Sequence, residues 1–385
     1  MPEQVVVLGA GYAGAGAIMR LQDDLDESAD LVWISDRDYH LVLHESHRII
    51  RDPSIGTKIT IPIAEIAAPS TTFRQGTVVG VDVDAREIEL DDGEIVPYDY
   101  LLIAIGSQTP YYGIPGLAEH SHTLKSLDDA LEIHERVAEA AREASASDPA
   151  RVIVGGAGLS GVQTAGEVAE YRDRHDAPIE IVLAEALDEI MPGSDAELQK
   201  AIRRRLEDRD VRILTGNPIV EAEPEVIHFD EGEPLPYDVL VWTGGITGRD
   251  ALETADVEKE HNRVNADSTF QTSDERVFAI GDTAIVEQGG TDVAPPTAQA
   301  AWQAADVAAE NIVRTLTGRP LRTWTFEDKG TLISVGEDAV AHDVQYFPLS
   351  TFGSVPAKTL KKFVAARWIA GLTSWNRAMR AWNDL

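Results

Sequence analysis

Two short segments of this 385-residue chain resemble each other and constrain its fold more than any other feature. Residues 5–14 read VVVLGAGYAG, and residues 152–161 read VIVGGAGLSG. Each is a run of mostly β-branched residues, then Gly-x-Gly-x-x-Gly, then an alanine-rich helical stretch, and a second hydrophobic strand ending in an acid follows. This order predicts two Rossmann-type dinucleotide-binding units in an α/β fold.

The first glycine motif has the residue types that a dinucleotide turn needs. Its first glycine permits the tight turn, its second lets the backbone approach a pyrophosphate, and its third allows the helix to pack closely. The N-terminus of the helix then faces the phosphate charge. An acid that closes the next strand, LVWIS, can accept hydrogen bonds from an adenosine ribose. The predicted site consists of Gly9, Gly11, Tyr12, Ala13, Gly14, Asp36 and Arg37.

The second motif predicts a nicotinamide dinucleotide. Its acid, Glu185, ends the strand IEIVLA, and Ala186, Leu187 and Asp188 follow it. Because no arginine follows closely, a 2′-phosphate would meet negative charge, and NAD is favoured over NADP. The predicted site consists of Gly156, Gly158, Leu159, Ser160, Gly161 and Glu185.

The chain contains no cysteine. This excludes disulfides, thiolate metal sites and redox-active dithiols, so electron transfer must use a cofactor. No metal site is predicted. The net charge of −33 makes nucleic acid an improbable partner, and the shortage of lysine resembles proteins from salt-loving organisms. The alternative is an ordinary acidic protein.

Two glycine motifs followed by the segment VFAIGDTA (277–284) resemble the flavin-dependent pyridine nucleotide oxidoreductase superfamily. The resemblance implies FAD at the first motif and NAD(H), as substrate, at the second. It assigns Asp282, after Gly281, to the flavin ribityl chain, and the alternative for Asp282 is an Asx turn. It further implies Ala104 and Gly106 at the crossover from the flavin domain, and Gly244 and Gly245 beside the nicotinamide.

Within the superfamily, three segments resemble type II NADH:quinone oxidoreductases: 98–116 (YDYLLIAIGSQTPYYGIPG), 294–312 (APPTAQAAWQAADVAAENI) and 326–340 (FEDKGTLISVGEDAV). The resemblance covers about residues 5–341 and implies hydride transfer from NADH to FAD, then two electrons to a membrane quinone, without proton pumping. It places Ala298, Gln299, Ala301 and Gln303 at the flavin and quinone, with Gln299 and Gln303 as catalytic candidates. The alternative is that this helix is only tightly packed.

The chain departs from the family at two places. Gln163 stands where the family typically has a glutamate near the nicotinamide, and we expect Gln163 to occupy the catalytic centre although it cannot carry a proton. In HLVLHESHR (40–48), which lacks the expected proline-containing stretch, His44 and His47 could supply protons, but solvated loop histidines are the favoured interpretation. A soluble NADH-dependent reductase or oxidase and a FAD/NADH redox sensor remain alternatives. Sulfide:quinone oxidoreductase is a disfavoured alternative, because that chemistry uses cysteines to hold sulfur and this chain has none.

The C-terminal segment 356–385 carries six basic residues and one acid. Its apolar residues recur every three or four positions, which predicts an amphipathic helix, broken near Gly371 or Ser374, that lies on a membrane surface. The alternative is a helix packed on the protein body or at a homodimer interface. No apolar run is long enough to span a bilayer, so we expect a peripheral protein on the cytoplasmic face of the cell membrane. The predicted stripe is Leu360, Val364, Trp368, Leu372, Trp375, Met379 and Trp382.

The predicted division of the chain follows from these motifs. Residues 1–118 and 270–325 form the FAD domain, which is interrupted by the NAD domain at 119–269. Residues 326–385 form a C-terminal region that ends in the amphipathic helix.

Overall fold

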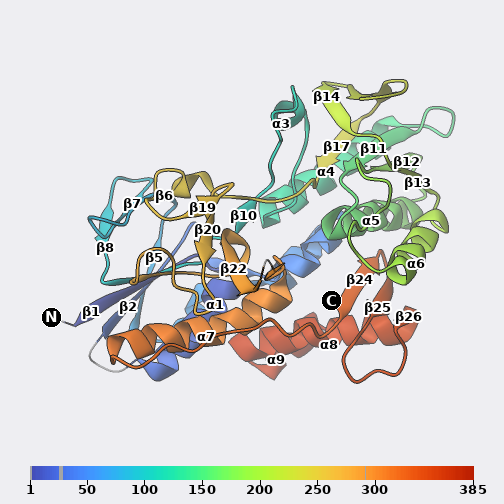
Figure 1. The fold of residues 1–385 in the computed structure, drawn as a ribbon. Helices are drawn as coiled ribbons and strands as arrows, with labels where there is room; N and C mark the ends of the chain where they lie inside the picture. The colour runs from blue at the N-terminus through green and yellow to red at the C-terminus, as the bar shows by residue number, and fades with distance from the viewer. Residues whose placement is uncertain (1, 26–28, 291) are drawn as a thin grey trace.

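The computed structural model describes residues 2–25, 29–290 and 292–385. Its first sheet is parallel throughout, with strand order β21-β9-β1-β2-β5. The chain enters at β1 and reaches β2 through helix α1, which is the order that the first motif predicts (Figure 1). The strands are β1 (Glu3–Leu8), β2 (Ala29–Ser35), β5 (Thr71–Gln75), β9 (Tyr100–Ile103) and β21 (Val277–Ala279).

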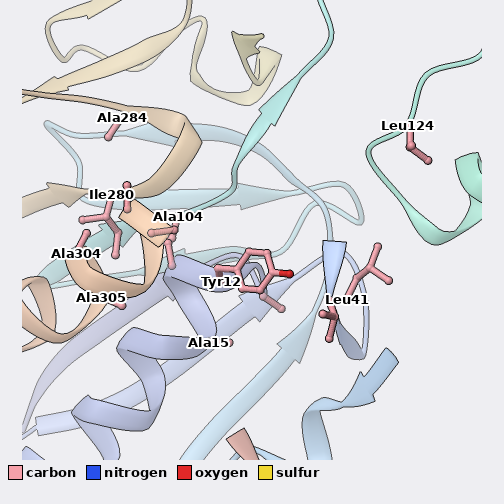
Figure 2. Packing of buried hydrophobic residues seen from close by; sticks show 14 of the residues in the cluster. Tyr12, Ala15, Leu41, Ala104, Leu124, Ile280, Ala284, Ala304 and Ala305 are labelled. Atoms are coloured by element: carbon pink, nitrogen blue, oxygen red, sulfur yellow. The ribbon is translucent and has the colours of Figure 1, made fainter. Parts of the chain in front are cut away.

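Two helices pack together against this sheet. α1 (Tyr12–Asp24) lies along α7 (Ala298–Leu316), whose alanines turn inward. A Cβ at Gly16 would come within 2.8 Å of the Ala305 methyl group, so only small residues permit this approach. Figure 2 shows this close packing, with Tyr12 extending from the start of α1 toward Leu41.

The second sheet is also parallel, with order β13-β12-β11-β17. Helix α5 (Leu159–His175) connects β11 to β12 and α6 (Ala196–Glu207) connects β12 to β13, while α4 (Leu127–Glu143) leads into the sheet. This is the second Rossmann unit that the repeat predicts. The strands are β11 (Ala150–Gly155), β12 (Ile179–Ala184), β13 (Val211–Leu214) and β17 (Val239–Trp242).

Small antiparallel sheets and ribbons complete both units. One sheet joins β6 (Val78–Asp82), β7 (Glu87–Leu90) and β8 (Ile95–Pro97), and another joins β14 (Ile219–Glu223), β15 (Val226–Phe229) and β16 (Leu235–Pro236). The remaining short pairings involve β3 (Tyr39–Leu41), β4 (Thr60–Pro62), β10 (Ser107–Gln108), β18 (Thr247–Gly248), β19 (Lys259–Glu260), β20 (Arg263–Ala266), β22 (Ala284–Gly289) and β23 (Asp292–Val293).

Between β3 and β4 the chain forms η1 (Leu43–Ile50), η2 (Pro53–Ile55) and α2 (Gly56–Ile59). η1 is a 3₁₀ helix that contacts both α4 and α5 and so joins the two Rossmann units. Two other short helical turns, η3 (Ile63–Glu65) and α3 (Leu117–His120), lie in connections.

The C-terminal region forms a three-stranded antiparallel sheet followed by two helices. The sheet consists of β24 (Thr331–Val335), β25 (Asp338–His342) and β26 (Thr351–Gly353). α8 (Ser354–Leu372) packs on β25, and α9 (Trp375–Ala381) follows after Ser374, whose hydroxyl caps it by accepting from the Arg377 N–H (Figure 1, red). The predicted break near Gly371 or Ser374 is confirmed.

Candidate functional site

Both glycine turns have the backbone that their sequence requires. Gly9 has φ +99° and Gly156 has φ +92°, a region that side chains rarely tolerate. A Cβ on Gly14 would collide with the Gly9 carbonyl, and one on Gly161 with the Gly156 carbonyl. By contrast, a Cβ on Gly11 or Gly158 would meet no described atom within 4 Å, so the backbone at these second glycines is open to a ligand.

Both motifs open onto one cavity of about 770 Å³. Its lining comes from the ends of the parallel strands, where ligands bind in open α/β sheets. The structure therefore brings together most of the residues predicted to hold FAD with several predicted to hold NAD. Lining residues from the prediction are Gly9, Gly11, Tyr12, Ala13, Asp36, Arg37, Ala104, Gly106, Gly281, Asp282, Ala298, Gly158, Leu159, Ser160, Gln163 and Gly245.

The other predicted residues lie outside the lining: Gly14, Gly156, Gly161, Gly244, Glu185, Gln299 and Gln303. The Glu185 carboxylate accepts from the Ala157 N–H (2.6 Å) and the Leu187 N–H (3.1 Å), which fixes the glycine turn.

Gln299 and Gln303 bind the backbone of the segment that precedes β24. Gln299 donates to the Gly330 carbonyl (3.2 Å) and accepts from the Lys329 N–H (2.7 Å). Gln303 donates to the Glu327 carbonyl (2.8 Å) and accepts from the Glu327 N–H (3.1 Å). The side-chain amides of Gln299 and Gln303 thus connect α7 to residues 327–330 and do not line the cavity. Their catalytic role remains a prediction.

Asp282 lies beside a lysine that the sequence did not single out. Its Oδ2 accepts from the Ser107 hydroxyl (3.2 Å), which in turn accepts from the Lys125 Nζ (3.1 Å). Lys125 lines the cavity, and burial lowers the pKa of its ammonium group while the Asp282 charge raises it. No local motif marks Lys125, because its position depends on the fold of the 119–126 crossover.

Tyr12 is the centre of an aromatic cluster that joins the cavity to the C-terminal helix. Its ring lies 5.3 to 5.6 Å from the rings of His40, His44, Trp302 and Trp368. Trp302 and Trp368 stack with centroids 4.8 Å apart and an angle of 1° between planes. Trp368 Nε1 donates to His40 Nε2 (2.9 Å). Helix α8 is therefore part of the wall next to the cavity.

The favoured interpretation of His44 and His47 as solvated loop residues is wrong. Both lie on η1, and His47 is only 2% exposed. Burial lowers the pKa of His44 to about 4 and that of His47 well below its ordinary value. The tyrosine hydroxyl of Tyr12 bonds His44 Nδ1.

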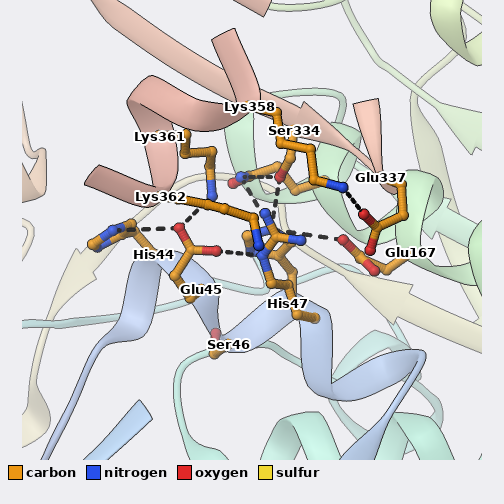
Figure 3. A network of polar contacts seen from close by, with 12 residues as sticks. His44, Glu45, Ser46, His47, Glu167, Ser334, Glu337, Lys358, Lys361 and Lys362 are labelled. Carbon is orange, nitrogen blue, oxygen red and sulfur yellow. Dashed lines mark hydrogen bonds and ion pairs between the residues drawn. The ribbon is translucent and has the colours of Figure 1, made fainter. Parts of the chain in front are cut away.

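A buried ionic network connects η1 to α8 (Figure 3). Glu45 is fully buried and pairs with both Arg48 and Lys361. Burial raises the pKa of the Glu45 carboxyl, but the two cations more than reverse this and hold it well below its usual range. Burial lowers the pKa of Lys361 to about 8. Lys361, one of the six basic residues of the predicted membrane-surface segment 356–385, is a buried ion-pair partner and does not face outward.

Gln163 also lies inside this network. It is 6% exposed, its Nε2 donates to Ser334 Oγ (3.1 Å) and it lies 3.3 Å from His47 Nε2. His47 Nε2 is 2.8 Å from Ser334 Oγ. Because Gln163 and His47 both line the cavity, the network reaches the site itself.

The predicted apolar stripe is only partly exposed. Trp368 and Leu372 face the protein body, whereas Trp375 and Met379 are exposed. Phe363, which is outside the stripe, is also exposed and its ring stacks 6.4 Å from Trp375. The prediction that the stripe forms one exposed face is wrong. Lys361 points inward to pair with Glu45, and this pairing sets the rotation of α8.

No helix in the described part of the chain is long and apolar enough to cross a bilayer.

Comparison with known sequences assigns the family. Residues 3–305 match the family described as pyridine nucleotide-disulphide oxidoreductase. The chain belongs to this family. The predicted α/β fold with two Rossmann units agrees with this assignment.

Curated relatives support the narrower resemblance. The type II NADH:quinone oxidoreductase of Staphylococcus saprophyticus is 27% identical over 89% of this chain and 88% of its own length. That of Staphylococcus aureus is 29% identical over 87% of this chain and 88% of its own length. The predicted resemblance to type II NADH:quinone oxidoreductases is confirmed.

Solved structures share the fold along the whole chain. The structure of NDH2 from Plasmodium falciparum in complex with NADH has a TM-score of 0.84 at 18% identity, covering 100% of this chain and 97% of that one. The sulfide:quinone oxidoreductase from Aquifex aeolicus has a TM-score of 0.80 at 18% identity, covering 97% and 92%. At these identities the likeness shows the fold alone.

Proposed function

We propose that this chain is a FAD-dependent NADH:quinone oxidoreductase. The observation that carries the proposal is that both glycine loops, 9–13 and 158–160, line one cavity. Two dinucleotides bound at these loops would bring their reactive rings into the same cavity, as hydride transfer requires. The relatives named type II NADH:quinone oxidoreductase support the donor and the acceptor.

The cavity fits FAD at the first motif. The open backbone at Gly11 and the helix start at Tyr12 suit a pyrophosphate. Asp36 and Asp282 both line the cavity; Asp36 would bind the ribose, and Asp282, which accepts from the Ser107 hydroxyl, would bind the ribityl chain. We assign 1–118 with 270–325 to FAD, 119–269 to NADH, and 326–385 to the acceptor side.

When bound, FAD accepts a hydride and passes electrons on, one pair at a time. The chain itself aligns the two dinucleotides, excludes water and supplies protons. The wall formed by Tyr12, Trp302 and Trp368 shields the cavity on the side of α8. Lys125 provides a positive charge inside the cavity, next to Asp282.

A membrane quinone is the acceptor that the C-terminal surface favours. Phe363, Trp375 and Met379 are exposed on α8 and α9, and Arg367 and Arg380 are exposed beside them in the sequence. Exposed aromatic and cationic side chains together suit the headgroup region of an anionic bilayer. This surface lies on the helices that reach the aromatic wall, so a quinone arriving from the bilayer would enter near Trp302 and Trp368.

Stopped-flow spectroscopy in molar salt tests the function. NADH should bleach the flavin absorbance of the purified holoprotein within a turnover, and a short-chain quinone should restore it. Rapid reduction by NADH with reoxidation by oxygen but not by quinone would instead indicate a soluble oxidase. If NADH reduces the flavin only slowly, whichever acceptor is present, the protein would instead be a redox sensor.

A further inference from the structure

The side chain of Glu167 has no role in the site described so far. It lies on α5, one turn after Gln163, and is fully buried. Neither carboxylate oxygen has a hydrogen-bond partner among the described residues. A buried, unsatisfied carboxylate costs folding free energy, so its presence calls for a functional explanation.

Glu167 is within reach of an imidazole that lines the cavity. Its Oε1 lies 3.9 Å from His47 Nε2, and its Oε2 lies 3.3 Å from Arg51 Nη1. Figure 3 shows Glu167 and His47 facing each other, with Ser334 above them. Arg51 in turn pairs with Glu337, whose side chain is 35% exposed. Glu167 thus lies between the cavity and the solvent side of the network.

The hydrogen bonds around His47 assign its tautomer. Gln163 Nε2 lies 3.3 Å from His47 Nε2, and an amide nitrogen can only donate, so His47 Nε2 accepts this hydrogen bond and the Ser334 hydroxyl donates to it as well. Nε2 is therefore the unprotonated nitrogen, and Nδ1 carries the hydrogen. In this tautomer the ring can accept a proton at Nε2, on the Glu167 side, and release one at Nδ1.

We propose that Glu167 and His47 supply the proton that the quinone takes up, a role that rests on the function proposed above. Conversion of quinone to quinol needs two electrons and two protons. NADH supplies the electrons and one hydrogen as hydride, so one proton per turnover must come from elsewhere. Glu167 loses its O–H proton to His47 Nε2, and His47 releases its Nδ1 proton to the acceptor oxygen. Solvent then reprotonates Glu167, and the His47 ring returns its hydrogen from Nε2 to Nδ1 before the next turnover.

The charges around Glu167 are compatible with this role. It is faced by Arg48 from η1, Arg51 just after η1, Lys361 from α8, and Glu170 from its own helix. Burial outweighs the cations and raises the pKa of Glu167 to about 6, so the acid form is populated near neutral pH. Burial, together with the same cations, keeps the His47 pKa low, so an imidazolium formed there passes its proton on quickly.

Three variants test the proposal. Glu167→Gln removes the proton but retains size, and His47→Gln removes the relay. Asp173→Asn is the matched control, because Asp173 lies on the same helix but is exposed and binds Arg172 and Arg209. Each holoprotein is titrated by infrared difference spectroscopy between pH 5 and 7 without NADH or quinone. The protonated-carboxyl band should titrate near pH 6 in the wild type and Asp173→Asn and be absent in Glu167→Gln.

Kinetics then separate the half-reactions. Reoxidation by a short-chain quinone should slow about 100-fold in both Glu167→Gln and His47→Gln. In Glu167→Gln, whose side chain does not line the cavity, flavin reduction by NADH should keep its wild-type rate. Wild-type reoxidation should slow as pH rises through about 6, because the acid form disappears, and Glu167→Gln should lose that pH dependence. If Glu167→Gln does not retain flavin, His47→Gln carries the kinetic test alone.

Wild-type-like reoxidation in either variant, or a carboxyl band that persists in Glu167→Gln, overturns the proton assignment. If the wild type itself is not reoxidised by quinone, the proposed function fails first, and the two failures are thereby distinguished.

Discussion

Replacing Glu45 with glutamine should be among the most destabilising single substitutions in the chain. The carboxylate is fully buried between Arg48 and Lys361, and Glu45→Gln would leave these two buried cations with a neutral partner. Removing one member of a buried ion pair typically costs about 3–5 kcal/mol, chiefly because the remaining charge is desolvated and uncompensated. Because two cations lose their partner here, we expect Glu45→Gln to lower the free energy of unfolding by about 4 kcal/mol or more.

A double-mutant cycle identifies the cause of that loss. Lys361→Met alone leaves Glu45 paired with Arg48 and should cost less than Glu45→Gln. The double variant Glu45→Gln/Lys361→Met should be more stable than Glu45→Gln alone, because one uncompensated cation has been removed. Urea unfolding in molar salt, followed by tryptophan fluorescence, measures the free energy of unfolding of the wild-type holoprotein, the two single variants and the double variant. A cost for Glu45→Gln below about 1 kcal/mol, or strictly additive effects, would refute the network as described.

Three further outcomes follow from the structure. Burial raises the pKa of Glu167 from 4.5 to about 6, so the folded state binds this proton more tightly than the unfolded state does. The stabilising contribution of Glu167 therefore falls by about 2 kcal/mol in total as pH rises from well below 4.5 to well above 6. Comparing the pH-dependent unfolding of wild type and Glu167→Gln should show that difference, and parallel curves would contradict it. Gly161→Ala should abolish NADH binding in calorimetry while the flavin spectrum persists, because the added methyl collides with the Gly156 carbonyl, whereas Gly371→Ala, where a Cβ meets nothing within 4 Å, should bind normally. Exchanging the exposed Phe363, Trp375 and Met379 for serine should reduce sedimentation with anionic vesicles at least tenfold without affecting NADH oxidation by a soluble dye, whereas exchange of the exposed but distant Leu187 should leave vesicle binding unchanged.

Those surface substitutions are preferable to truncation of the C-terminus. Lys361 and Trp368 belong to the buried network and the aromatic wall, so removal of α8 would damage the cavity as well as any membrane contact.

The parts of the fold that follow from short-range chemistry could be predicted. The positive φ of Gly9 and Gly156 and the close packing at Gly14 and Gly161 depend on residues within a few positions, and the motif specifies them. The buried strands that carry no polar residue were predicted for the same reason.

The interior of the site could not be predicted because its partners are distant in sequence. Glu45 and Lys361 are separated by 316 positions, and His47 and Ser334 by 287. Residues 40–48 are polar, and without knowledge of those distant partners their sequence indicates a solvated loop. The rotation of α8 depends on the same pairing, which explains why the apolar period alone predicted the wrong exposed face.

One measurement tests the central claim most directly: reoxidation of the NADH-reduced holoprotein by a short-chain quinone without oxygen, recorded at the flavin absorbance. A shared cavity for both dinucleotides predicts rapid bleaching by NADH, followed by full recovery within one turnover after quinone is added. A flavin that NADH does not bleach, or that stays reduced with quinone present, would contradict the account.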